Sequence, residues 1–197
     1  MLRSMNPDAQ AVYQFWFPPD ADQDQPRREW FIKDDAFDQQ IRERFGALVD
    51  QALSGALRSW DAEGPRSALA RILLLDQFTR NIHRGTPLAF AGDALALQAA
   101  QDMVDGDEDL AMPPFHRSFI YMPFEHAEDM EMQNQAVALF TRLSKAHPAL
   151  NDMCDYARKH REVIARFGRF PHRNDVLGRR STPEELDYLK TAKRFGQ

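Results

Sequence analysis

The sequence predicts an all-α protein, an antiparallel helix-pair stack of about eight helices. Apolar residues recur at intervals of three and four along most of the chain, which is the helical period. Only 9 of the 197 residues are glycine, and the prolines fall at the boundaries between apolar segments. Short connections favour antiparallel neighbours, and no repeat of fixed period indicates a regular solenoid. The length suits a single domain over residues 1–197.

Two helices are expected before the first break in the chain. Asn6 is a suitable N-cap and Pro7 a suitable first residue for a helix that stops at Pro18. Residues 20–29 are acidic, rich in glutamine and typical of a loop. A long helix then begins at about Asp34, with apolar residues at regular spacing: Phe37, Ile41, Phe45, Leu48 and Ala52.

The most apolar helix of the sequence is expected at about 66–83. Gly64 and Pro65 break the chain before it, and Gly85 ends it. Because apolar residues occur on several of its sides, this helix should be central and buried nearly all round. A further helix covers about 87–104 and leads into an acidic loop.

The second half of the chain continues the helical pattern. The prolines at 113–114 open a short helix, which Pro123 is expected to interrupt. Helices of matched length follow at about 126–146 and 149–167. The second of them ends at Gly168, a natural C-cap.

A last helix is expected after a basic loop at 168–180. Ser181 or Thr182 caps it, and Glu184 and Glu185 stand in its first turn, where the helix dipole favours acids.

Composition excludes several classes of function. A net charge of −5 disfavours general nucleic-acid binding, although the basic loop keeps RNA contact open as a third possibility. No apolar run could span a bilayer, and residues 1–10 lack the apolar core of a signal peptide. The lone Cys154 forms no internal disulfide and no cysteine-based zinc site. We therefore expect a cytoplasmic protein without membrane or nucleic-acid partners.

Opposite charges are concentrated in two segments. Residues 158–180 carry eight Arg or Lys against two acids, whereas residues 98–132 carry nine acids against one Arg. The hairpin of the two preceding helices brings residue 168 near residue 126. We therefore predict that the loop folds back over the start of the 126–146 helix, with Arg169 or Arg173 within salt-bridge reach of an acid there: Glu125, Glu128 or Asp129.

Charged residues also occur within the predicted buried helix. Asp76, Arg80 and Arg84 are spaced by four and share one stripe. Charges on an apolar helix need partners, so one interpretation is a structural Asp76–Arg80 pair. The other is that Arg80 and Arg84 reach into a cavity and bind an anion.

A second group of polar residues follows the helices at 126–146 and 149–167. Asp129 and Gln133 lie on the stripe of core residues in the first helix, so we expect both to face inward. His160 lies on the apolar stripe of the second, either as a satisfied core histidine or as part of a site. His126 and His160, together with a carboxylate, could hold a metal or exchange protons.

The basic loop offers cations for a fork-shaped anion site, namely Arg169, His172, Arg173 and Arg179. The same cations could instead pair with acids and hold the last helices in place. No HExxH pattern and no cysteine ligand supports a metal. We predict neither a metal nor a cofactor.

Three segments resemble the bacterial DUF924 family. They are LDQFTRNIHRGTP at 75–87, YMPFEHAED at 121–129 followed by Gln133, and FGRFPHRN at 167–174 followed by LGR and STPEE. Ala127 stands where the family pattern has Ser, so any chemistry that needs that hydroxyl would be missing here. The resemblance implies a fold similar to tetratricopeptide-like helix-pair superhelices. It implies no activity, because the family is of unknown function.

Two hypotheses for function follow. The first is a site for a small anionic ligand bearing phosphate or carboxylate, in which His126 and Asp129 are the best acid/base pair. The residues expected to bind the ligand are Arg80, Arg84, Glu125, Gln133, His160, Arg169, His172 and Arg173. The alternative is an interaction scaffold that holds a peptide on a concave face.

Overall fold

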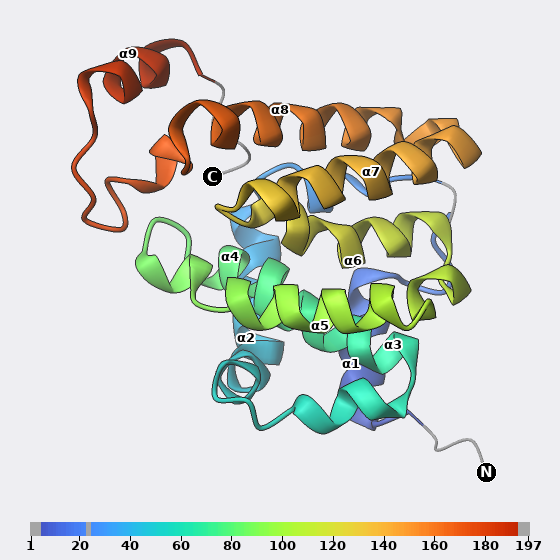
Figure 1. The fold of residues 1–197 in the computed structure, drawn as a ribbon. Coiled ribbons are helices and arrows are strands. Elements are labelled where there is room, and N and C mark those ends of the chain that lie inside the picture. Colours follow the sequence, from blue (N-terminus) through green and yellow to red (C-terminus); the bar gives the residue numbers. More distant parts are fainter. Residues whose placement is uncertain (1–4, 23–24, 193–197) are drawn as a thin grey trace.

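The computed structural model describes residues 5–22 and 25–192, and this part of the chain is all-α, with no strand (Figure 1). Nine α-helices are present in it, eight of them with seven or more residues. No helix in these residues is both long enough and apolar enough to cross a membrane. The α-helices are α1 Pro7–Trp16, α2 Asp35–Leu53, α3 Pro65–Ile72, α4 Thr79–Ile82, α5 Asp93–Asp105, α6 Pro114–His126, α7 Met130–Ala146, α8 Asn151–Phe167 and α9 Pro183–Thr191.

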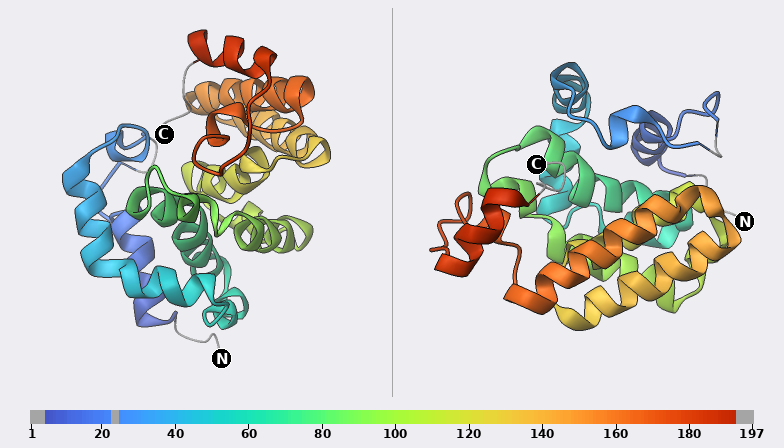
Figure 2. Two further views of the ribbon diagram at one scale, coloured as in Figure 1. Left: turned by 90° about the vertical axis from the view of Figure 1, so that its left-hand side faces the viewer. Right: turned by 90° about the horizontal axis from the view of Figure 1, so that it is seen from above.

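The helices form two connected halves. In Figure 1, α5, α6, α7 and α8 lie one above another, and each packs against the next. Helices α1 and α2 lie beside this stack (Figure 2) and pack on the central run that contains α3 and α4. One hydrophobic cluster takes side chains from α1 to α8, and a small second cluster joins the end of α8 to α9.

Local capping signals place three helix ends as predicted. The side chain of Asn6 accepts hydrogen bonds from the first turn of α1. Thr182 and Glu185 form a reciprocal capping box at the start of α9. Gly168 ends α8 in the left-handed region, at φ 70°, where a residue without a Cβ is favoured.

The central helical run is buried, as its apolar pattern predicts, but it is not a regular α-helix. A π-helical segment, η3 (Leu73–Phe78), lies between α3 and α4. Such segments add a residue to a turn and are frequent at functional sites. Here the segment contains Asp76, whose side chain is completely buried.

The expectation that Pro123 interrupts its helix is wrong. Helix α6 runs through Pro123 to His126, and the next helix begins only at Met130. Proline removes one main-chain donor and crowds the preceding turn. The burial of neighbouring Met122 and Phe124 in the core offsets that cost.

A close main-chain contact fixes the start of α5 against the π-helical segment. A Cβ placed on Gly92 would lie 2.1 Å from the carbonyl oxygen of Leu75. Only glycine allows the two backbones to approach this closely. The contact brings Asp93, the first residue of α5, next to the charged residues of the central run.

Candidate functional site

The centre of the candidate site is a hydrogen-bonded pair formed by His126 and Asp76. His126 is the last residue of α6, and its Nδ1 lies 2.6 Å from Oδ1 of Asp76. The other carboxylate oxygen accepts a hydrogen bond of 2.6 Å from the amide of Gln77. The imidazole is 16% exposed, whereas the aspartate is fully buried.

The carboxyl group of Asp76 is held in its ionised form. Burial by itself would raise its pKa, but His126 and Arg80 outweigh this effect and lower the pKa to about 2. An ionised carboxylate can only accept hydrogen bonds. Nδ1 of His126 is therefore the donor, and none of the described residues forms a hydrogen bond with Nε2.

Two arginines share a second aspartate beside this pair. Arg80, in α4, binds Asp93 through both terminal nitrogens, at 2.7 and 3.0 Å, and lies 3.3 Å from Oδ1 of Asp76. Arg173 lies in η7 (Pro171–Arg173) and donates to the same Asp93 at 3.3 Å. It also donates to the main-chain carbonyl of His126 at 3.0 Å. The site thus joins five segments of the chain.

The guanidinium of Arg173 is held between two aromatic rings. Its central carbon lies 4.6 Å from the ring centroids of both Phe90 and Phe170. Each aromatic ring attracts the positive charge of the guanidinium. Burial, followed by the charge of Arg80, lowers the pKa of Arg173 to about 10. At neutral pH the side chain therefore remains a positioned cation.

Both arginines retain an unused donor. Nε of Arg80 and Nε of Arg173 are buried and have no hydrogen-bond partner among the described residues. Buried polar groups are seldom left unpaired in folded proteins. A bound anion or a water molecule would satisfy these two donors.

A second histidine–carboxylate pair lies next to the first. Nδ1 of His160, in α8, is 2.9 Å from Oε1 of Glu125, and the ring centroids of His126 and His160 are 6.3 Å apart. Gln133 faces inward, as predicted, and donates to the carbonyls of Glu125 and Ala127 at 2.6 and 2.8 Å. These groups fix the turn that follows His126.

His172 differs in character from the arginines around it. Burial, then the charges of Arg173 and His160, lower the pKa of His172 to about 3. The ring is therefore neutral at physiological pH. It therefore adds no positive charge to the site.

The basic loop does fold back over the start of α7, but through a different arginine from those predicted. Arg179 binds Glu128 through two hydrogen bonds of 2.7 and 2.9 Å. Arg169 pairs instead with Glu185 in α9, and Arg173 with Asp93. The main-chain N–H of Phe170 also donates to Glu128, at 2.8 Å.

Two further predictions about individual residues are wrong. Asp129 is exposed, because it is the N-cap of α7 and accepts a hydrogen bond from the main chain of Met132. The carboxylate that orients His126 is Asp76. Arg84 does not join Arg80, because α4 ends at Ile82 and the side chain turns to Asp38 on α2.

Three residues of the site were not identified from the sequence. Asp93 stands among ordinary first-turn acids of helices, and Phe90 and Phe170 look like core residues. The sequence held one signal that pointed to a missing partner. Asp76 lies on an apolar helix, where a buried charge needs a partner. No group of three His, Cys, Asp or Glu side chains with metal-binding geometry is found in residues 5–22 and 25–192.

Comparison with known proteins agrees with the resemblance seen in the motifs. The model of the family described as bacterial protein of unknown function (DUF924) matches residues 12–193. The chain belongs to the DUF924 family. A solved structure of another protein of unknown function, from Agrobacterium tumefaciens, is similar to the chain at 40% identity and a TM-score of 0.80. The match covers 93% of this DUF924 chain and 97% of the other. No curated protein matches the sequence.

Proposed function

We propose that this protein binds a small anionic ligand, bearing a phosphate or carboxylate group, at His126, and that His126 exchanges a proton with it. The observation that carries the proposal is the orientation of His126 by a fully buried, ionised Asp76. A carboxylate that holds one imidazole nitrogen leaves the other as a positioned proton acceptor, as in general-base catalysis.

Three further features support an anionic ligand. Arg80 and Arg173 flank the histidine, and each has a buried donor without a described partner. Guanidinium groups match the geometry of carboxylate and phosphate oxygens. The aromatic rings of Phe90 and Phe170 fix Arg173, so little conformational entropy is lost when it binds a ligand.

The other residues first considered for this site have different roles in the proposal. The turn that follows His126 would be positioned by Glu125, Gln133 and His160. His172 would contribute a hydrogen bond. Arg169 is bound to Glu185 at a distance of 2.7 Å and would hold α9 in place without contacting the ligand.

The test is a thermal-shift screen of the full chain against phosphate- and carboxylate-bearing metabolites. A compound at 100 times its dissociation constant should stabilise the protein by about 2.7 kcal/mol. His126→Gln should lose that shift. His147→Gln, a matched change at an exposed histidine in the turn after α7, should keep it. A compound that stabilises both variants equally would count against the site.

A peptide-binding scaffold remains the alternative. It predicts that acidic peptides, and none of the small compounds, stabilise the protein, with no dependence on His126.

We further propose that residues 1–197 form one domain and that the protein is cytoplasmic, as its composition and single cysteine indicate.

A further inference from the structure

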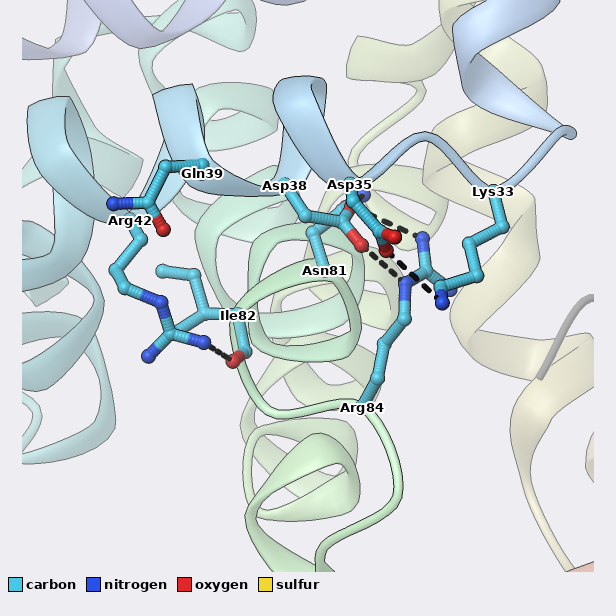
Figure 3. Close-up of a pocket in the computed structure, with 8 residues that line it drawn as sticks. All are labelled: Lys33, Asp35, Asp38, Gln39, Arg42, Asn81, Ile82 and Arg84. Carbon is cyan, nitrogen blue, oxygen red and sulfur yellow. Dashed lines mark hydrogen bonds and ion pairs between the residues drawn. The ribbon is translucent and has the colours of Figure 1, made fainter.

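A depression of about 230 Å³ lies between α2 and the end of α4 (Figure 3), and its lining includes neither His126 nor Asp76. Its lining is almost entirely polar. The residues that matter for its chemistry are Lys33, Asp35, Asp38, Arg42, Asn81 and Arg84.

Two of the three cations around the depression already have counter-ions. Lys33 lies 2.9 Å from Asp35, and Arg84 lies 2.5 Å from Asp38. The amide of Asn81 also donates to Asp38, at 2.6 Å. These contacts fix one side of the depression and neutralise its charge.

Arg42 is the cation without a counter-ion. Its guanidinium donates to the main-chain carbonyl of Ile82, at the end of α4. None of the described carboxylates lies within salt-bridge distance of it. Figure 3 shows Arg42 on the opposite side of Asn81 and Ile82 from Arg84 and Lys33, so it lies apart from the other two lining cations.

We infer that this depression is a second binding site, for a small phosphate- or carboxylate-bearing anion. Three cations stand against two carboxylates, so an anion that enters meets one uncompensated positive charge. A guanidinium that uses a single donor on a carbonyl keeps others for a bidentate contact. The amide oxygen of Asn81 would accept a hydrogen bond from a protonated or hydroxylated ligand.

The experiment uses the full chain and two probes, inorganic phosphate and succinate, each titrated by calorimetry at low ionic strength. Arg42→Gln should weaken binding at least about fivefold, because it removes the uncompensated charge and a charge-assisted hydrogen bond. Arg42 is exposed, so the variant should fold normally. Arg58→Gln is the matched control, because Arg58 is also an exposed arginine but lies outside the depression.

A third variant separates this site from the one at His126. His126→Gln should leave binding at the depression unchanged, and raising the salt concentration to about 0.5 M should weaken that binding several-fold. Equal affinity in wild type and Arg42→Gln overturns the inference. So does an equal loss in Arg58→Gln, a loss in His126→Gln alone, or failure of the wild-type protein to bind either probe.

Discussion

Replacing Asp76 by Asn tests whether the charge of this buried carboxylate stabilises the fold. The substitution keeps the volume of the side chain and removes its charge. Three groups now donate to the carboxylate, from His126, Arg80 and Gln77. Arg80 keeps Asp93 as a partner in the variant, but His126 loses the charge that orients it.

The magnitude follows from the pKa of the carboxyl group. Its value falls from 3.8 to about 2 on folding, and each unit corresponds to about 1.36 kcal/mol. The ionised carboxylate therefore contributes on the order of 2–3 kcal/mol to the free energy of unfolding at neutral pH. We expect Asp76→Asn to lower that free energy by about 3 kcal/mol at pH 7.

The pH dependence has a definite sign. Because the folded pKa lies below the unfolded pKa, the contribution is complete above about pH 4 and is lost as the pH falls toward 2. The difference between wild type and Asp76→Asn should therefore shrink across this window.

The measurement is urea unfolding of both proteins at pH 7, 5, 3.5 and 2.5. Asp102→Asn, at an exposed carboxylate of α5, should change the free energy by less than about 0.5 kcal/mol throughout. A difference for Asp76→Asn that stays constant from pH 7 to pH 2.5 would refute the electrostatic reasoning.

Three other expectations concern the fold. Gly92→Ala should destabilise the protein by about 3 kcal/mol, because its Cβ would overlap the carbonyl of Leu75, whereas Gly46→Ala, with open space around it, should be neutral or stabilising. Comparing their urea midpoints tests this. Gln133→Leu should cost about 2–3 kcal/mol by leaving two main-chain carbonyls unpaired, and unchanged amide exchange in the turn after α6 would contradict it. Residues 1–197 should unfold in one transition, and two separate calorimetric peaks would argue for two domains.

The helices were predictable because their signals are local. Asn6 and Thr182 cap helices through hydrogen bonds within three residues, and Gly168 ends one through its own backbone angles. Pro123 gave a misleading local signal. Its cost to the helix is offset by tertiary packing, which residue spacing alone does not contain.

The partners of the site residues were not predictable in the same way. His126 meets Asp76 across 50 residues of sequence, and Arg173 meets Asp93 across 80. Several acids were within reach of each arginine. The sequence pattern therefore identified the charged segments but not which arginine pairs with which acid. The charge complementarity of the basic loop and α7 was real, but Arg179 forms the contact with Glu128.

The two proposed sites should select their ligands by different physical means. At His126, the charges of Arg80 and Arg173 are balanced by Asp76 and Asp93. An anion there gains little from net charge, so its affinity would depend on oriented donors and should respond weakly to salt. At Arg42 the charge is uncompensated and exposed, where screening by salt is strong. A ligand that owes its affinity to shape and hydrogen bonds therefore suits the first site, whereas a simple anion suits the second.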